Sequence, residues 1–96
     1  MAGSKLPPEF DILSRVADAQ EANARELFEY ALAMELVKDG RAEVVERRMV
    51  NMRENVTFKT AAGMTFMLLE PDIIPELLSQ MGEMVREVMD EEKGGS

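Results

Sequence analysis

One stretch of the chain restricts the fold more than any other part of the sequence. No glycine or proline occurs between Pro8 and Gly40. Apolar residues recur along this stretch in steps of three, four or seven, which places them on one face of a helix. Pro8 suits a first helical turn, and Gly40 suits a left-handed helix cap. The sequence therefore predicts a helix over about residues 8–39.

The next stretch, at about residues 41–55, is predicted to be a second helix. Apolar residues from Ala42 to Val56 follow a stripe with heptad-like spacing. Because the link between the two helices is short, we expect them to pack as an antiparallel hairpin. Residues at equal distances from the link would then form surface ion pairs, namely Glu35 with Arg47 or Arg48, and Arg25 with Glu54.

Residues 56–69 are open to two interpretations. Threonine, valine and phenylalanine are weak helix formers, and Gly63 lies near the centre of the segment. Apolar and polar residues alternate on both sides of Gly63, so a short β-hairpin fits better than a helix. The alternative is an all-α bundle in which the second helix continues to residue 69. After Pro71, a broad apolar stripe predicts a C-terminal helix over about residues 73–92.

The predicted fold class is therefore mainly α. The chain of 96 residues would form a single small helical domain over residues 1–96, with disordered tails at about 1–6 and 93–96. It has no cysteine, so no disulfide can stabilise it. Three amphipathic helices on so short a chain leave apolar surface uncovered, and we therefore expect a homodimer. The predicted elements are an antiparallel helical hairpin (8–39 and 41–55), a β-hairpin (56–69) and a C-terminal helix (73–92).

The residue types present argue against catalysis. Histidine and cysteine, the groups that most often act near neutral pH, are both absent. Two carboxylate pairs, Glu26 with Glu29 and Glu43 with Glu46, have a spacing that can hold metal ions in helical bundles. The predicted hairpin would keep these pairs roughly 12–15 Å apart along its axis. The sequence thus predicts no enzyme, cofactor or metal ion, and a carboxylate–metal site formed across subunits is an alternative.

The charge balance disfavours a nucleic-acid partner. Eleven lysines and arginines stand against 19 acidic residues, which gives a net charge of −8. A nucleic-acid-associated regulator remains an alternative, because residues 41–59 hold the one basic stretch. No stretch reaches the roughly 20 apolar residues of a membrane span, and the expected location is cytoplasmic. The residues of the basic stretch are Arg41, Arg47, Arg48, Arg53 and Lys59.

Methionine is unusually frequent, with nine in the chain. Six of them form Met-x-x-Met pairs at 49/52, 64/67 and 81/84. Thioethers suit Cu(I), but copper sites that use methionine usually include histidine or cysteine as well. Methionine also fills irregular gaps in cores and lines surfaces that adapt to a partner. Core packing and a partner-binding groove are therefore the two main interpretations of these residues.

Surplus apolar surface predicts a non-catalytic protein–protein interaction or assembly module, such as an adaptor, a chaperone-like factor or an accessory subunit. Its partners would be a second copy of the chain and another, unidentified protein. The candidate residues of a hydrophobic cleft are Leu32, Leu36, Met49, Met52 and Met81. The open edge of the predicted ribbon would add Phe58, Phe66 and Met67 as dimer contacts, although the two phenylalanines could instead plug the helical hairpin.

Overall fold

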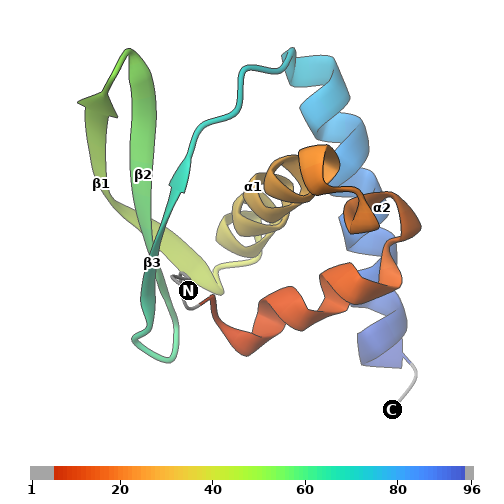
Figure 1. Ribbon diagram of the computed structural model, residues 1–96. Helices are drawn as coiled ribbons and strands as arrows, with labels where there is room; N and C mark the ends of the chain where they lie inside the picture. Colours follow the sequence, from red (N-terminus) through yellow and green to blue (C-terminus); the bar gives the residue numbers. More distant parts are fainter. Residues whose placement is uncertain (1–5, 95–96) are drawn as a thin grey trace.

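The computed structural model describes residues 6–94, which form an α+β fold. A three-stranded antiparallel sheet lies on one side of the protein and the helices lie on the other (Figure 1). Residues 1–5 and 95–96, which hold most of the predicted tails, lie outside the described residues. In chain order, the elements are the 3-10 helices η1 (Pro8–Arg15) and η2 (Ala17–Gln20), helix α1 (Ala22–Lys38), strands β1 (Ala42–Val50), β2 (Arg53–Thr60) and β3 (Thr65–Leu69), and helix α2 (Pro75–Gly94).

The predicted mainly α fold class is wrong, because residues 41–55 do not form a helix. They make up β1 and the beginning of β2, which pair as an antiparallel hairpin. The valines of β1 favour this outcome, since a β-branched side chain loses rotamer freedom in a helix and packs well on a sheet. The all-α alternative, with a helix continuing to residue 69, is wrong for the same reason. A hairpin does lie over residues 56–69, but it is the β2–β3 part of a three-stranded sheet.

The predicted first helix is interrupted as well, since only Ala22–Lys38 is α-helical. Upstream, η1 and η2 are separated at Val16, which has extended dihedral angles (φ −95°, ψ 109°). The buried residues of this region are Phe10, Leu13, Val16 and Ala19, so every third residue is buried. Three residues is the period of a 3-10 helix, whereas an α-helix has a period of about 3.6 residues. The apolar pattern of residues 8–20 therefore fits 3-10 geometry better than it fits an α-helix.

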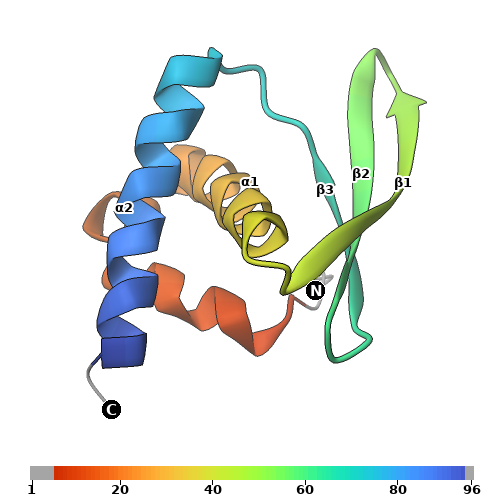
Figure 2. The same cartoon turned by 180° about the vertical axis from the view of Figure 1, so that it is seen from behind.

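The sheet has the strand order β1-β2-β3 and packs one face against the helices. Val56, Phe58 and Phe66 point to that face and are buried. Side chains alternate along a strand, so Thr57 and Met67, which pair across β2 and β3, point to the opposite face. Figures 1 and 2 show the helices on one face of the sheet and none on the other.

Aromatic rings occupy the centre of the core. Phe58 is fully buried and lies 5.2 Å from Phe66 in a stacked arrangement. Tyr30 from α1 meets Phe58 edge-on at 6.3 Å, and Phe10 from η1 meets Phe66 edge-on at 5.1 Å. These four rings therefore join α1, η1 and the sheet. On the other side of α1, helix α2 adds Val85 and its buried methionines to the same core.

The phenol of Tyr30 gives the fold a predictable response to alkaline pH. Burial raises the pKa of Tyr30 above its ordinary value of 10.0, and the Glu70 carboxylate raises it further. Arg47 acts against this rise, but the net direction is upward. Above pH 10 the unfolded chain therefore binds fewer protons than the folded protein, so the free energy of unfolding falls, by up to about 1.4 kcal/mol per pH unit.

Replacement of Tyr30 by phenylalanine should remove this contribution. We expect the melting temperature of the wild type to fall more than that of Tyr30→Phe between pH 9 and pH 11, as followed by circular dichroism. The lysines and the other ionising groups are common to both proteins, so the difference isolates the phenol. Parallel melting-temperature curves for the two proteins over this range would contradict the assignment.

Candidate functional site

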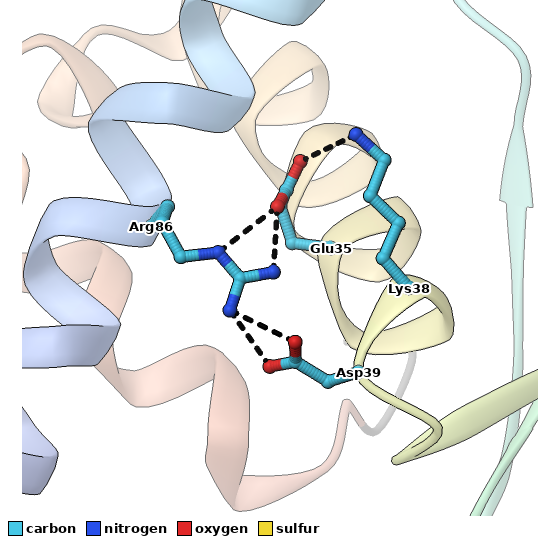
Figure 3. Close-up of polar contacts among 4 residues, drawn as sticks. All are labelled: Glu35, Lys38, Asp39 and Arg86. Carbon is cyan, nitrogen blue, oxygen red and sulfur yellow. Dashed lines mark hydrogen bonds and ion pairs between the residues drawn. The ribbon is translucent and has the colours of Figure 1, made fainter.

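A polar network between α1 and α2 is the first feature that could carry chemistry. Glu35 is the one charged side chain that is buried among the described residues, with 8% exposure. Its Oε1 accepts hydrogen bonds from Arg86 Nε at 3.2 Å and Nη2 at 2.8 Å, and its Oε2 accepts one from Lys38 Nζ at 3.2 Å (Figure 3). Arg86 Nη1 also donates to Asp39 at 2.9 Å. We call these four residues the α1–α2 clamp.

The geometry of the clamp indicates a structural role. Hydrogen bonds to Glu35 and then to Asp39 raise the pKa of Arg86, so the guanidinium stays charged and does not act as a base. Gly82 provides the space for the carboxylate, because a Cβ atom at this position would lie 2.7 Å from Oε2 of Glu35. Both carboxylate oxygens are thus occupied by donors from two helices. The arrangement holds α2 against α1 and leaves no free group for catalysis within the clamp.

The far half of the β1–β2 hairpin is the second feature. Every residue from 45 to 53 is exposed, on both strands and through the turn. We call residues 45–53 the hairpin arm. In Figures 1 and 2 the tip of this arm stands apart from α1, which covers the other end of the hairpin. A β-bulge between Val44 and Glu46 marks the point where the arm leaves the body.

The turn of the hairpin arm has an unusual residue at its tip. Asn51 and Met52 both have positive φ angles, of 52° and 67°. Two-residue hairpin turns of this kind favour Asn-Gly, because glycine adopts positive φ without steric cost. Asparagine tolerates the left-handed region, but methionine does not favour it. Met52 nevertheless occupies this position, and its side chain is 94% exposed.

A hollow lies beside the tip, with a volume of about 490 Å³. Met49, which is 66% exposed, lies on its rim together with Met52. Two exposed thioethers and several polar residues therefore line the hollow together. Some of the polar residues belong to the segment after β3. The remaining lining residues are Arg53, Glu54, Glu70, Pro71 and Asp72.

Three of the four arginines in the predicted basic stretch are engaged within the protein. Arg47 pairs with Glu54 at 2.9 Å, and Arg48 pairs with Glu46 at 3.1 Å. Arg53 donates to the backbone carbonyl of Glu70 at 3.1 and 3.3 Å. Arg47 and Arg48 also point to opposite faces of the sheet, because they are adjacent on one strand. These contacts do not gather the cations into one basic patch.

The two ion pairs predicted from the helical hairpin are wrong. Glu35 pairs with Arg86 and Lys38 rather than with Arg47 or Arg48. Arg25 pairs with Glu29, one turn along α1, at 3.1 Å. Both predictions assumed that residues 41–55 return alongside α1 as a helix, and the strand geometry removes that assumption.

The candidate cleft residues are divided between the core and the surface. Met49, Met52 and Met67 are exposed, at 66%, 94% and 59%. The arm brings Met49 and Met52 together, whereas Met67 lies on the uncovered face of β3. The buried candidates are Leu32, Leu36, Phe58, Phe66 and Met81.

The carboxylate pairs also lie apart, with Glu26 and Glu29 on α1 and Glu43 and Glu46 on β1. Within residues 6–94, no group of three or more acidic residues lies close enough to hold a metal ion. No helix in the same range is long and apolar enough to cross a membrane. No protein-family model, curated protein or solved structure matches this chain.

Sequence reasoning missed the α1–α2 clamp, although one signal for it was present. Glu35 interrupts the most apolar part of the first helix, directly before Leu36 and three residues after Leu32. Those leucines are fully buried, and the carboxylate beside them is buried too. A buried carboxylate requires a cation. The identity of that cation, Arg86, depends on how α2 packs, and no local pattern contains that information.

Proposed function

We propose that this chain is a non-catalytic protein-interaction module that contacts a partner protein through the hairpin arm. The observation that carries the proposal is the conformation and exposure of Met52 at the tip of the arm. A methionine in this position lowers the stability of the isolated domain and adds apolar surface in water. Strained, exposed residues of this kind concentrate where a protein binds something.

The surroundings of Met52 support the same proposal. Met49 and Val50, which is 39% exposed, place two more apolar side chains near the tip. Methionine adapts its shape to an apolar partner surface because its side chain is unbranched and flexible. The charged residues along the arm provide the polar rim that protein interfaces usually have. An adaptor, a chaperone-like factor or an accessory subunit would use such an arm.

Replacing Met52 by glycine should separate stability from binding. We expect Met52→Gly to raise the free energy of unfolding by about 0.5–1 kcal/mol, because it creates the favoured Asn-Gly turn. The matched control is Gly63→Ala in the β2–β3 turn. Gly63 has φ 94°, and a Cβ atom there would meet nothing within 4 Å. That variant should lose about 1 kcal/mol from backbone strain alone. Urea denaturation measures both changes, and a less stable Met52→Gly protein would contradict the turn argument.

The same variant tests the function. The wild type, Met52→Gly and a Met84→Ser control serve as baits in native lysate, and the captured proteins are quantified by mass spectrometry. Met84 is a partly exposed methionine on α2, at 38%. We expect a partner that the wild type and Met84→Ser capture equally and that Met52→Gly captures at least tenfold less. Equal capture by all three baits would remove the hairpin arm from the interface.

Two further parts of the proposal come from the sequence. The homodimer expected from the sequence stays a prediction. A cytoplasmic location also belongs to the proposal, because a chain without cysteine loses no stabilising disulfide in a reducing compartment.

A further inference from the structure

Backbone groups at the outer edge of β3 have no hydrogen-bond partner among residues 6–94. Thr60 N donates to Met64 O, and Glu70 N donates to Glu54 O, both at 2.8 Å. In an antiparallel pair, hydrogen-bonded residues alternate with residues whose backbone groups point away from the partner strand. Phe66 and Leu68 therefore face β2, and the residues between and beside them face outward. The outward set is Thr65, Met67 and Leu69, which offers three N–H donors and three carbonyl acceptors.

The two edges of the sheet differ in how they are protected. β1 carries a bulge and several charged side chains, which are the usual devices against pairing with another chain. β3 has the sequence TFMLL, with no charge, proline or bulge. Met67 and Leu69 are 59% and 45% exposed. An unprotected, apolar edge of this kind is a template for an additional strand.

A groove runs along this free edge, with a volume of about 220 Å³. Met67, Leu68 and Leu69 all line it, although adjacent residues of a strand point to opposite faces. A space that touches both faces of β3 must lie at its edge. The opposite wall comes from α1, through Glu26 and Glu29.

The helix wall gives the groove a negative charge. Glu26 is exposed, and its carboxylate has no hydrogen bond or ion pair to another described residue. Glu29 shares its carboxylate with Arg25 at 3.1 Å. The groove thus combines an unpaired carboxylate with a bare strand edge. The net charge of −8 on the chain adds to the attraction for a basic ligand.

We infer that the β3 edge binds an extended segment of another protein as a fourth strand, with lysine or arginine on the side that faces α1. The backbone of the incoming strand would pair with Thr65, Met67 and Leu69. Its apolar side chains would pack on Met67 and Leu69 at the uncovered face, and its cations would meet Glu26. This site is separate from the hairpin arm, because β2 lies between β1 and β3 in the sheet and the outward groups of β3 point away from β2.

A second copy of the chain fits this edge poorly. If β3 paired antiparallel with β3 of a second copy around a two-fold axis, the two sheets would form one continuous sheet. The helix-covered faces of both sheets would then lie on the same side. Each copy would then bring its α1 and the carboxylates of Glu26 and Glu29 toward those of the other copy. Like charges that face each other destabilise such an interface. A basic peptide replaces this repulsion by attraction.

The test uses a fluorescein-labelled peptide of alternating lysine and valine, Lys-Val-Lys-Val-Lys-Val-Lys, and its glutamate counterpart, Glu-Val-Glu-Val-Glu-Val-Glu. Anisotropy measures binding to the full chain, and NMR amide exchange locates the site. We expect the lysine peptide to bind at least tenfold more tightly than the glutamate peptide. We also expect it to protect the amides of Thr65, Met67 and Leu69 from exchange. The amides of the hairpin arm should stay unchanged.

Two variants with a matched control separate the backbone and charge contributions. Met67→Pro removes an outward N–H and leaves the β2–β3 ladder intact, so it should fold and lose at least tenfold in affinity for the lysine peptide. Met67→Thr keeps the N–H and should lose no more than about threefold. Glu26→Lys should lose about tenfold for the lysine peptide and gain affinity for the glutamate peptide.

Three outcomes would overturn the inference. The first is a folded wild type that shows no anisotropy change with the lysine peptide at millimolar concentration. The second is equal binding by Met67→Pro and Met67→Thr, because strand addition requires the N–H that distinguishes them. The third is a wild-type dimer in light scattering that becomes monomeric in Met67→Pro, because a second copy then occupies the edge. None of these results depends on the Met52→Gly experiment, so this site and the hairpin arm can fail separately.

Discussion

Replacing Phe58 by alanine should lower the free energy of unfolding by about 3–5 kcal/mol. The ring has no exposed surface, stacks on Phe66 at 5.2 Å and meets Tyr30 at 6.3 Å. Its removal loses the transfer free energy of a phenyl group and leaves a cavity between α1 and the sheet, where neighbouring side chains can relax only in part. A domain of this size has a total stability of about 5–15 kcal/mol, so the loss is a large part of it.

Urea denaturation of Phe58→Ala at several protein concentrations measures this effect. Met67→Ala is the matched control, because Met67 lies in the neighbouring strand but is 59% exposed on the uncovered face. The control should change the free energy of unfolding by no more than about 0.5 kcal/mol. The loss in Phe58→Ala should not depend on protein concentration if the ring belongs to the core. A concentration-dependent loss would instead make Phe58 a dimer contact.

The helices and turns that are marked by short sequence patterns could be predicted from the sequence. Helix α1 has an uninterrupted apolar pattern that ends before Gly40, and Gly40 does adopt a positive φ of 74°. Pro75 begins α2, in the position where a missing N–H is harmless. The turn between β2 and β3 contains Gly63 with φ 94°, as a glycine in a hairpin turn commonly does. Each of these signals is complete within a few residues.

The strand β1 could not be predicted in this way. Its partner is β2, and pairing places Ala42 opposite Thr60 and Val50 opposite Arg53. A strand gains stability from such cross-strand neighbours, which a search for helical periodicity does not consider. The charged residues of β1 do not alternate strictly with apolar ones, because most of the strand is exposed on both faces. A strand is usually recognised by alternating apolar and polar residues, and this alternation is absent when neither face of the strand is buried.

The candidate sites depend on still longer-range contacts. The groove at β3 requires Glu26 and Met67, which are far apart in the chain, to line the same space. The Met-x-x-Met spacing did draw attention to Met49 and Met52, and both lie at the tip of the arm. The same spacing had a different outcome for Met81, which is buried, and Met84, which is partly exposed. Spacing alone therefore does not distinguish a core methionine from a surface one.

Breaking the α1–α2 clamp should produce the second large effect. We expect Arg86→Met to lower the free energy of unfolding by about 2–3 kcal/mol. Glu35 would keep its buried position, and Lys38 would be its one remaining donor. A buried carboxylate that loses its main partner retains the unfavourable free energy of desolvation. The side chain of Arg86 is 30% exposed, which places the effect below the value for a fully buried pair.

The double variant Glu35→Met/Arg86→Met distinguishes an ion pair from simple packing. Both charged groups are removed together, and methionine has a similar volume and adapts to irregular space. We therefore expect the double variant to recover most of the loss and to lie within about 1 kcal/mol of the wild type. A double-mutant cycle, measured by urea denaturation, should give a coupling free energy above about 1 kcal/mol. Strictly additive losses would mean that Glu35 and Arg86 contribute independently, and that the hydrogen bonds between them do not hold α2 against α1.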